Sequence, residues 1–426
     1  MDIKLNEEKI KYEIKSRLSV LEKAKNYYKK VITDVVPVEV IGEVLYTYSY
    51  TDYKLQDKQY FFSIFKQVEI GEKVAVDEND YMIVEGVTIN YCTFESCKFQ
   101  NIKFIHCNFT GCEFKNVNFF HTTFESCYFS SPYFEKGCNS VDDISNVFTV
   151  FDKCIFLSRF INCNLEYGYL KKCSLTLVEY YYCNMKSAYM DTCAFSGVEF
   201  KDSDLTYAKL YNADIFDIDV SDDKCTKVNE ETFFDYKIYA KRPRRGKMVE
   251  TESGWKKNDY DEMILEKSKT LRRVSNLFEK NGYSSFAGEY FYWSKRVERN
   301  CLHGAKKIIS TCGLILCGYG ERPLFTLVSI LASILIFGIL YLFAGFKIDG
   351  NEYGINQIVG AWPNILQIIK YYGHSVFFSI TTFSTVGYGN YVPVGAVSSF
   401  LAAIQMIVGV SLSALWTGCI FKKISR

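Results

Sequence analysis

Apolar positions recur every five residues through the middle of the chain. From Ile89 onward, phenylalanine holds one phase of this pattern, at positions 94, 99, 104, 109, 114, 119, 124, 129 and 134. A small or apolar residue, commonly cysteine, stands two positions before these phenylalanines, as in CTF, CKF, CNF and CEF. Neither a helix nor an alternating strand has a period of five, so the pattern predicts a structural repeat.

The repeat is interrupted once and then resumes. We predict a loop within 135–155, a restart at Phe156 and a slip of one residue at Phe160, after which apolar residues keep the phase up to Val220. Five residues with two pointing inward form one side of a coil, and four sides make a coil that stacks on the next at about 4.8 Å. The sequence therefore predicts a rod of about six coils.

This segment resembles the pentapeptide-repeat family, whose members wind into a square β-helix with one repeat per side. The resemblance implies a right-handed quadrilateral β-helix over 87–221 that serves as a binding surface. Some acidic members of the family resemble DNA in shape. Here the outward charges are mixed and the formal net charge of the chain is +1, so we expect no nucleic-acid partner.

Two long stretches near the C-terminal end carry no charge. Residues 323–346 and 395–421 contain about 24 and 27 residues, and at 1.5 Å per residue either helix exceeds the ~30 Å hydrocarbon core of a bilayer. Between them, residues 375–383 (SVFFSITTF) are too short to span. We predict two membrane spans separated by a short re-entrant helix, whose C-terminal end favours cations.

The sequence TVGYG follows the short helix directly. Its glycines permit backbone conformations that are closed to residues with a side chain. The stretch resembles a potassium-channel selectivity filter, and residues 323–421 resemble the two-transmembrane pore module of that family. The resemblance implies that backbone carbonyls replace the water around K⁺, and that four chains assemble as a homotetramer around one pore. The ion-binding positions would be Thr385, Val386, Gly387, Tyr388 and Gly389.

The flanks of this stretch depart from the family in one respect. The family usually has aspartate after TVGYG, and some members pair it with a carboxylate in the pore helix, whereas this chain has Asn390 and Thr381 at these places. A neutral hydrogen bond is the expected substitute for the carboxylate pair. Phe377 and Phe378 occupy the places where aromatic residues often form a cuff around the filter.

Gly409 lies about midway along the second uncharged stretch. In the family, a glycine at such a place commonly permits bending of the pore-lining helix, so Gly409 is a possible gating hinge. Close packing of helices through a small residue explains it equally well.

The other segments are less specific. Residues 6–33 predict a charged, amphipathic helix that contacts another subunit or packs on its own domain, and 259–300 predict a helical hairpin. The run 308–317 is apolar but too short to span, so we expect it at the membrane interface. The basic run 241–247 indicates an exposed linker. Together these segments predict a multidomain chain, with an N-terminal helix and short strands in 1–86, the β-helix in 87–221, a helical linker in 222–320 and an all-α two-span pore domain in 321–426.

Sixteen cysteines raise the question of metal or disulfide chemistry. Ten of them recur at five residues or multiples of five within each run of the repeat, without clustered histidines, so we interpret them as small buried apolar residues. We expect no cofactor, no metal beyond permeant potassium and no enzymatic activity. These cysteines are Cys92, Cys97, Cys107, Cys112, Cys127, Cys154, Cys163, Cys173, Cys183 and Cys193.

Basic residues flank both spans, at Lys306, Lys307, Lys422 and Lys423. This distribution predicts a multi-pass protein of the cell membrane with both termini in the cytoplasm. The sequence thus favours a tetrameric potassium channel whose cytoplasmic β-helix regulates gating or binds an unknown ligand or protein. The alternative is a membrane-tethered pentapeptide-repeat scaffold with a non-selective or vestigial pore.

Overall fold

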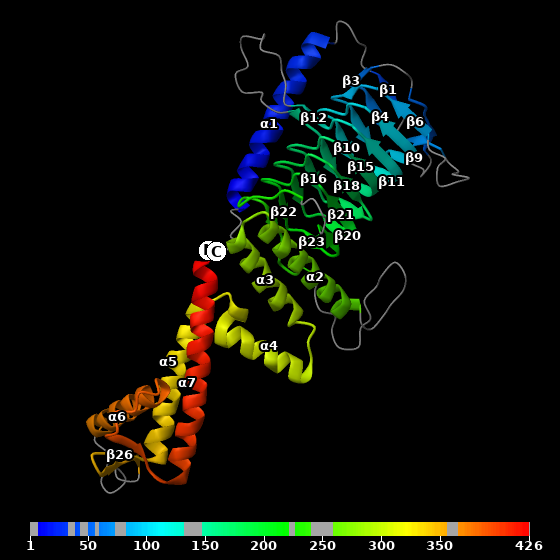
Figure 1. Ribbon diagram of the computed structural model, residues 1–426. Coiled ribbons are helices and arrows are strands. Elements are labelled where there is room, and N and C mark those ends of the chain that lie inside the picture. Colours follow the sequence, from blue (N-terminus) through cyan, green and yellow to red (C-terminus); the bar gives the residue numbers. More distant parts are fainter. Residues whose placement is uncertain are drawn as a thin grey trace. The chain divides into compact units, whose positions relative to one another are not determined.

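The computed structural model describes residues 7–32, 39–42, 50–55, 59–72, 82–131, 147–220, 226–239, 259–355 and 365–425. These residues belong to two compact units, Met1–Cys301 and Leu302–Arg426 (Figure 1). The basic run 241–247 lies outside the described residues.

The N-terminal unit is built around a β-solenoid. Its strands pair in parallel with their counterparts in the neighbouring coils, so the sheets form the sides of a rod. One sheet follows β1 (Val40–Ile41), β4 (Ile64–Lys66), β8 (Thr93–Glu95), β10 (Glu113–Lys115), β14 (Val150–Asp152), β16 (Tyr169–Lys171), β19 (Tyr189–Asp191), β22 (Lys209–Tyr211) and β25 (Phe233–Phe234).

A second, larger sheet covers two further sides of the coil. Its strands are β2 (Thr51–Asp52), β5 (Val68–Gly71), β6 (Met82–Glu85), β9 (Lys98–Ile105), β11 (Asn118–Glu125), β15 (Ile155–Ile161), β17 (Ser174–Thr176), β18 (Glu179–Tyr181), β20 (Ala194–Ser196), β21 (Val198–Lys201), β23 (Asp214–Ile215) and β24 (Ile218–Asp219). Two short pairs complete the strands of this unit, namely β3 (Tyr60–Phe61) with β7 (Ile89–Asn90) and β12 (Ser130–Ser131) with β13 (Val147–Phe148).

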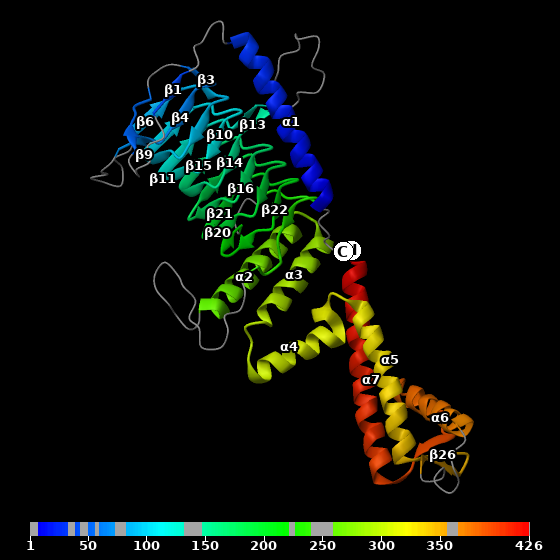
Figure 2. The same ribbon diagram turned by 180° about the vertical axis from the view of Figure 1, so that it is seen from behind.

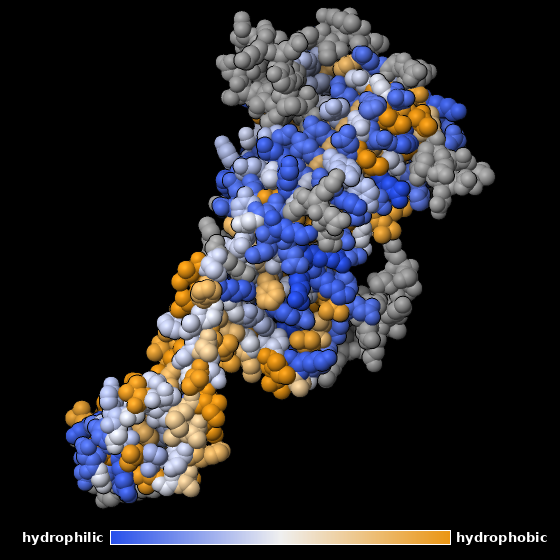
Figure 3. All heavy atoms as spheres, viewed as in Figure 1, coloured by the Kyte–Doolittle hydropathy of each residue, from blue (hydrophilic) through white to orange (hydrophobic). Residues whose placement is uncertain are grey.

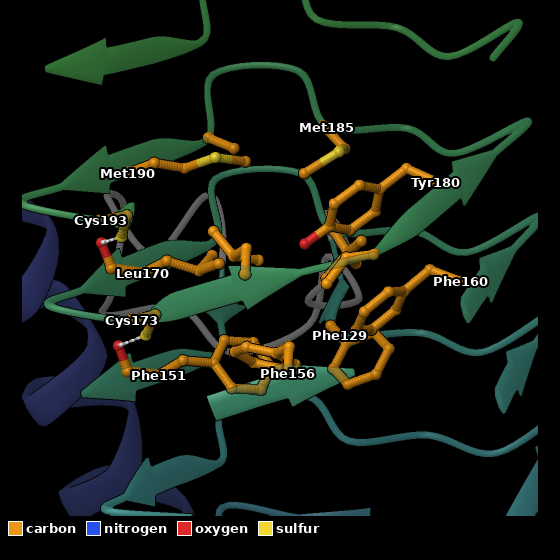
Figure 4. Close-up of a cluster of buried hydrophobic side chains, with 14 of the residues drawn as sticks. Phe129, Phe151, Phe156, Phe160, Leu170, Cys173, Tyr180, Met185, Met190 and Cys193 are labelled. Atoms are coloured by element: carbon orange, nitrogen blue, oxygen red, sulfur yellow. Dashed lines mark hydrogen bonds between the residues drawn. The ribbon is translucent and has the colours of Figure 1, made fainter. Parts of the chain in front are cut away.

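The large inward side chains stack in columns along the rod. Phe94 lies in register with Phe114, and Phe114 with Phe151, with ring centroids 4.7 and 5.0 Å apart. Figure 4 shows the continuation of this core, where aromatic rings give way to Leu170 and Met190. The five-residue period thus places one large side chain of each side in a continuous dry core.

The small inward residue makes a second, polar contact. In Figure 4 the Cys173 Sγ donates to the Phe151 carbonyl of the preceding coil at 3.4 Å, and Cys193 Sγ donates to Leu170 O at 3.5 Å. Ser203 makes the equivalent bond to Tyr180 O at 3.0 Å. This inward position therefore suits a small side chain that can donate one hydrogen bond. As expected, all ten cysteines of the repeat are buried, and they form no disulfides.

The β-helix is confirmed, and it is longer than the six coils expected. It comprises about eight turns over residues 40–234. The earlier coils contain buried Tyr60, Phe65 and Ile70, which already follow the period of five. The restart also comes earlier than Phe156, because Phe151 is buried in β14.

The one-residue slip is confirmed. Phe119 pairs with Phe156 and Phe124 with Phe160, and the register shifts between them, so β11 carries one residue more than β15. The bulge absorbs the missing residue without breaking the column of phenylalanines.

Helix α1 (Glu7–Ile32) packs along the side of the solenoid, as Figures 1 and 2 show from opposite directions. The Arg17 guanidinium donates to Ser187 O at 2.7 Å and lies 4.1 Å from the centre of the Tyr189 ring. Farther along, Lys25 pairs with Glu113. Of the two interpretations of this helix, the structure shows the packing on its own domain.

Helices α2 (Asp259–Lys280) and α3 (Ser284–Glu298) form the expected hairpin and cover the last coil. Thr270 Oγ1 accepts from Ile218 N at 3.1 Å, and the Tyr290 hydroxyl accepts from Phe234 N at 2.9 Å. Asn281 accepts from Val228 N at 3.2 Å. These contacts satisfy backbone groups that the end of a solenoid leaves without a neighbouring strand.

The C-terminal unit contains two helices long and apolar enough to cross a membrane, α5 (Pro323–Ala344) and α7 (Gly395–Ile424). Hydrophobic residues gather over both in Figure 3. The remaining elements of this unit are α4 (Gly304–Cys317), the 3₁₀ turn η1 (Gly318–Gly320), α6 (Ile365–Phe383) and the antiparallel strands β26 (Phe346–Ile348), β27 (Asn351–Tyr353) and β28 (Tyr391–Pro393).

Candidate ion-conduction site

The TVGYG stretch begins where α6 ends. Val386 N donates to the Thr381 carbonyl at 3.1 Å, and Thr385 N donates to Thr382 O at 3.1 Å. These bonds close the last turn of α6 and then direct the chain away from the helix axis. The C-terminal end of the helix, with its partial negative charge, therefore adjoins the stretch.

Three residues of this stretch have left-handed backbone conformations. The φ angles are +57° at Thr385, +53° at Gly387 and +85° at Gly389. Apart from the adjoining residues, a Cβ atom at either glycine would meet no heavy atom of the described residues within 4 Å. Within one chain, the need for glycine at these positions therefore comes from the backbone conformation and not from crowding.

The two residues of α6 that were expected to form a cuff face different surroundings. Phe377 stacks on Tyr388 of the TVGYG stretch at a centroid distance of 6.3 Å. Phe378 is buried instead against Tyr341 and Phe346, at 4.5 and 5.8 Å. Only Phe377 is thus in a position to support the stretch by direct ring contact within one chain.

The Thr381 side chain and the Asn390 backbone make hydrogen bonds in different places. The Thr381 hydroxyl donates to Phe378 O within its own helix at 2.9 Å. The Asn390 carbonyl accepts from Asp349 N at 3.1 Å, in the turn between β26 and β27. The residues that follow TVGYG then pair with β26. A three-stranded sheet therefore holds the far end of the stretch.

Residues 384–390 are exposed throughout in the single chain. Val386 is 56% exposed and Tyr388 is 71% exposed, although both side chains are largely apolar. The stretch thus lies open on the surface of the single chain.

Gly409 lies against the end of α6. A Cβ atom on Gly409 would be 2.2 Å from the Phe383 carbonyl oxygen. The structure therefore shows close helix packing at this glycine. Its role as a gating hinge stays a prediction.

Two family models match the chain. A model described as an ion channel matches residues 358–426, which include α6, the TVGYG stretch and α7. A model of pentapeptide repeats matches eight copies within residues 91–131. The chain joins pentapeptide repeats to an ion-channel domain. With its two apolar helices, the ion-channel domain implies a lipid bilayer environment.

Solved structures similar to this chain are pentapeptide-repeat proteins. A trypsin-treated variant of QnrB1, described as a plasmid-mediated fluoroquinolone resistance protein, is 15% identical over 45% of this chain and 89% of its own, with a TM-score of 0.21. HetL, a pentapeptide-repeat protein involved in heterocyst differentiation regulation from the cyanobacterium Nostoc sp. strain PCC 7120, is 11% identical over 43% and 78%, with a TM-score of 0.20. No curated protein sequence matches the chain significantly.

The ion-channel domain also contains residues that the sequence did not single out. Tyr341, Ser379 and Gln405 come from three different helices and are fully buried together. The available signal was Gln405, an amide within the uncharged stretch 395–421.

A second overlooked contact lies near the ends of the long helices. Glu321, before α5, pairs with Lys422 in the last turns of α7. The Glu321 side chain is only 5% exposed, whereas that of Lys422 is 43% exposed. The pair ties the start of one long helix to the end of the other.

Proposed function

We propose that this protein is a potassium-selective channel that works as a homotetramer in the cell membrane. The observation that carries the proposal is the TVGYG stretch at the C-terminal end of α6, with Gly387 and Gly389 at positive φ, inside a domain that an ion-channel model matches. In this proposal, the backbone carbonyls of Thr385–Gly389 replace the hydration shell of K⁺. The α6 end would favour the cation electrostatically.

Exposed side chains at the site support assembly. Val386 and Tyr388 are more than half exposed in the single chain. A filter built from one strand cannot surround an ion, whereas four copies related by a fourfold axis can. In such an assembly neighbouring subunits would cover these side chains.

The positions of basic residues next to α5 and α7 support one orientation of the protein in the membrane. Lys306 and Lys307 precede α5, and Lys422 and Lys423 end α7. By the positive-inside rule both termini then lie in the cytoplasm, together with the solenoid. We propose that the solenoid unit regulates gating or binds a partner there.

The proposal includes no enzymatic step and no cofactor, and K⁺ is the permeant ligand. Among the described residues, no group of three or more His, Cys, Asp or Glu is arranged to hold a metal ion. Carbonyl oxygens of the filter would instead supply the ion ligands.

The experiment is K⁺ efflux from proteoliposomes carrying the unmodified protein, Gly387→Ala or Gly350→Ala. Gly350 is the matched control, because its φ is +86° and a Cβ there also meets no heavy atom of the described residues beyond its chain neighbours within 4 Å. It lies outside the stretch, in the β26–β27 turn. We expect efflux to be lost in Gly387→Ala and kept in Gly350→Ala, with the mass of a tetramer in all three. Unchanged efflux in a correctly assembled Gly387→Ala variant would contradict the proposed role of the stretch.

A further inference from the structure

A network of buried hydrogen bonds joins α5, α6 and α7 of the C-terminal unit. The Tyr341 hydroxyl on α5 donates to Gln405 Oε1 on α7 at 2.7 Å. Gln405 Nε2 donates to Ser379 on α6, at 2.6 Å to Oγ and 3.1 Å to the carbonyl oxygen. Ser379 Oγ donates in turn to Ile334 O on α5 at 2.8 Å. The three side chains have 0% exposure, so the network is closed to water.

The direction of every bond in this network is fixed. The single hydroxyl proton of Ser379 goes to Ile334 O, a carbonyl that can only accept. Ser379 Oγ must therefore accept from Gln405, which places the amide nitrogen towards α6 and the amide oxygen towards Tyr341. An aliphatic residue at 405 would leave the Tyr341 hydroxyl buried without this acceptor, which is costly in a dry site.

The network lies between two close contacts that hold the same helix. On α5, a Cβ at Gly338 would come within 2.9 Å of the Val376 side chain of α6. On α7, a Cβ at Gly409 would meet the carbonyl of Phe383. Gln405 is one helical turn before Gly409. Helix α6 is therefore held by close contacts at Gly338 and Gly409, and by the hydrogen bonds of Gln405 between these two contacts.

We propose that Gln405 is a positioning residue, which sets the rotation and height of α6 through Ser379 and so holds the Thr385–Gly389 filter in its conducting conformation. This inference rests on the proposed channel function. It accounts for a filter without a carboxylate pair, since Thr381 and Asn390 are neutral and the Thr381 hydroxyl bonds within its own helix. Gln405 supports the filter from the side of α7, and the filter backbone itself binds the ion.

The test compares Gln405→Leu, Ser379→Ala and the double variant in reconstituted full-length protein. Met406→Leu is the matched control, because Met406 is the next residue of α7 and is 42% exposed. The measured quantities are the K⁺ to Na⁺ permeability ratio and the decay of K⁺ flux after external K⁺ is withdrawn. A residue that serves only the stability of the fold would not change either in protein that has assembled.

We expect Gln405→Leu to lower the permeability ratio about tenfold and to speed the decay, with the tetramer mass kept. The double variant should match Gln405→Leu alone, since both single changes remove the same bond between Gln405 Nε2 and Ser379 Oγ. Met406→Leu should behave as the unmodified protein. An unchanged ratio and decay in assembled Gln405→Leu would overturn the inference. If Gln405→Leu does not assemble, Ser379→Ala decides alone by the same two measurements. Failure of the channel proposal is distinguishable, because the unmodified protein would then show no K⁺ preference.

Discussion

The backbone of α7 at Gly409 lies directly against the carbonyl of Phe383, the last residue of α6. A Cβ at Gly409 would be 2.2 Å from this oxygen, well inside any tolerable contact. The proposed filter begins two residues after Phe383, so a displacement of this carbonyl would reach the proposed ion path directly. From the sequence, helix packing and helix bending explain Gly409 equally well. This contact shows the physical reason for close packing at this residue.

Gly409→Ala should therefore destabilise the pore domain by about 1–3 kcal/mol, because an extra methyl group must displace the end of α6. Thermal unfolding in detergent measures the effect. Gly418→Ala is the control on the same helix, since a Cβ there meets nothing within 4 Å. A Gly409→Ala protein that melts normally but opens less often would favour the hinge instead.

The solenoid core allows a second prediction at Cys107. Its buried thiol donates to Val84 O at 3.4 Å, and serine makes the corresponding bond at position 203. Cys107→Ser should thus change the free energy of unfolding by less than about 1 kcal/mol, whereas Cys107→Trp should overpack the coil and unfold it. Circular dichroism during urea unfolding distinguishes the two. Equal stability of both variants would contradict the packing described for this position.

Thiol labelling of the native protein tests the same core without mutation. Burial raises the pKa of the Cys97 thiol to about 12, so little reactive thiolate forms at neutral pH. Cys312 on α4 is exposed and serves as the internal positive control. We expect rapid labelling at Cys312 and slow labelling at the ten repeat cysteines, as measured by mass spectrometry. Fast modification of most repeat cysteines would show that the coils are open.

A buried lysine at the capped end of the solenoid predicts a pH effect. Lys267 on α2 is fully buried, and its ammonium group donates to Lys237 O. Burial lowers the pKa of Lys267 from 10.5 to about 8, although the nearby charges of Asp235 and Asp214 act in the opposite direction. Between pH 8 and 10.5 the unfolded chain therefore binds more protons at this group than the folded chain. The contribution of Lys267 to stability must rise with pH across that window.

The measurement is the free energy of unfolding at pH 8 and pH 10 for the unmodified protein, Lys267→Met and Lys269→Met. Relative to Lys267→Met, the unmodified protein should gain about 2 kcal/mol between pH 8 and pH 10. Lys269 is the control on the same helix, because its side chain is 52% exposed. Parallel pH curves for the unmodified protein and Lys267→Met would contradict the lowered pKa.

Local sequence patterns predicted the repeat and the candidate filter because each depends on neighbouring residues. The five residues of TVGYG contain the glycines that its backbone conformation requires. The phenylalanine period is visible because the same spacing recurs many times. The coils at Tyr60, Phe65 and Ile70 have the same period but lack the CxF signature over enough repeats to stand out.

Contacts between segments far apart in the chain could not be predicted from local sequence patterns. Gln405 meets Ser379 and Tyr341, which lie 26 and 64 positions away, and nothing local to Gln405 specifies either partner. The cap formed by α2 and α3 was missed for the same reason. Thr270 and Tyr290 bind backbone groups of the last coils, so their roles depend on where the solenoid ends.

The cap determines how the solenoid should be removed to test regulation. A deletion of residues 1–258 would leave α2 and α3 without the coil that they cover, whereas deleting 1–301 follows the boundary between the two units. The shorter protein should keep its ion selectivity and change its open probability in single-channel recordings, because the filter belongs to the second unit. Unchanged open probability would make the solenoid an anchor, and altered selectivity would contradict the separation of the two roles.

The most direct test of the account is the reversal potential of the reconstituted, unmodified protein with K⁺ on one side of the bilayer and Na⁺ on the other. Carbonyl ligands supplied by Thr385–Gly389 of four chains predict a strong preference for K⁺, so the reversal potential should lie close to the K⁺ equilibrium value. The same measurement with Gly387→Ala should give no selective current. A reversal potential near zero in the unmodified protein, with equal passage of Na⁺ and K⁺, would contradict the assignment of this chain as a potassium-selective channel.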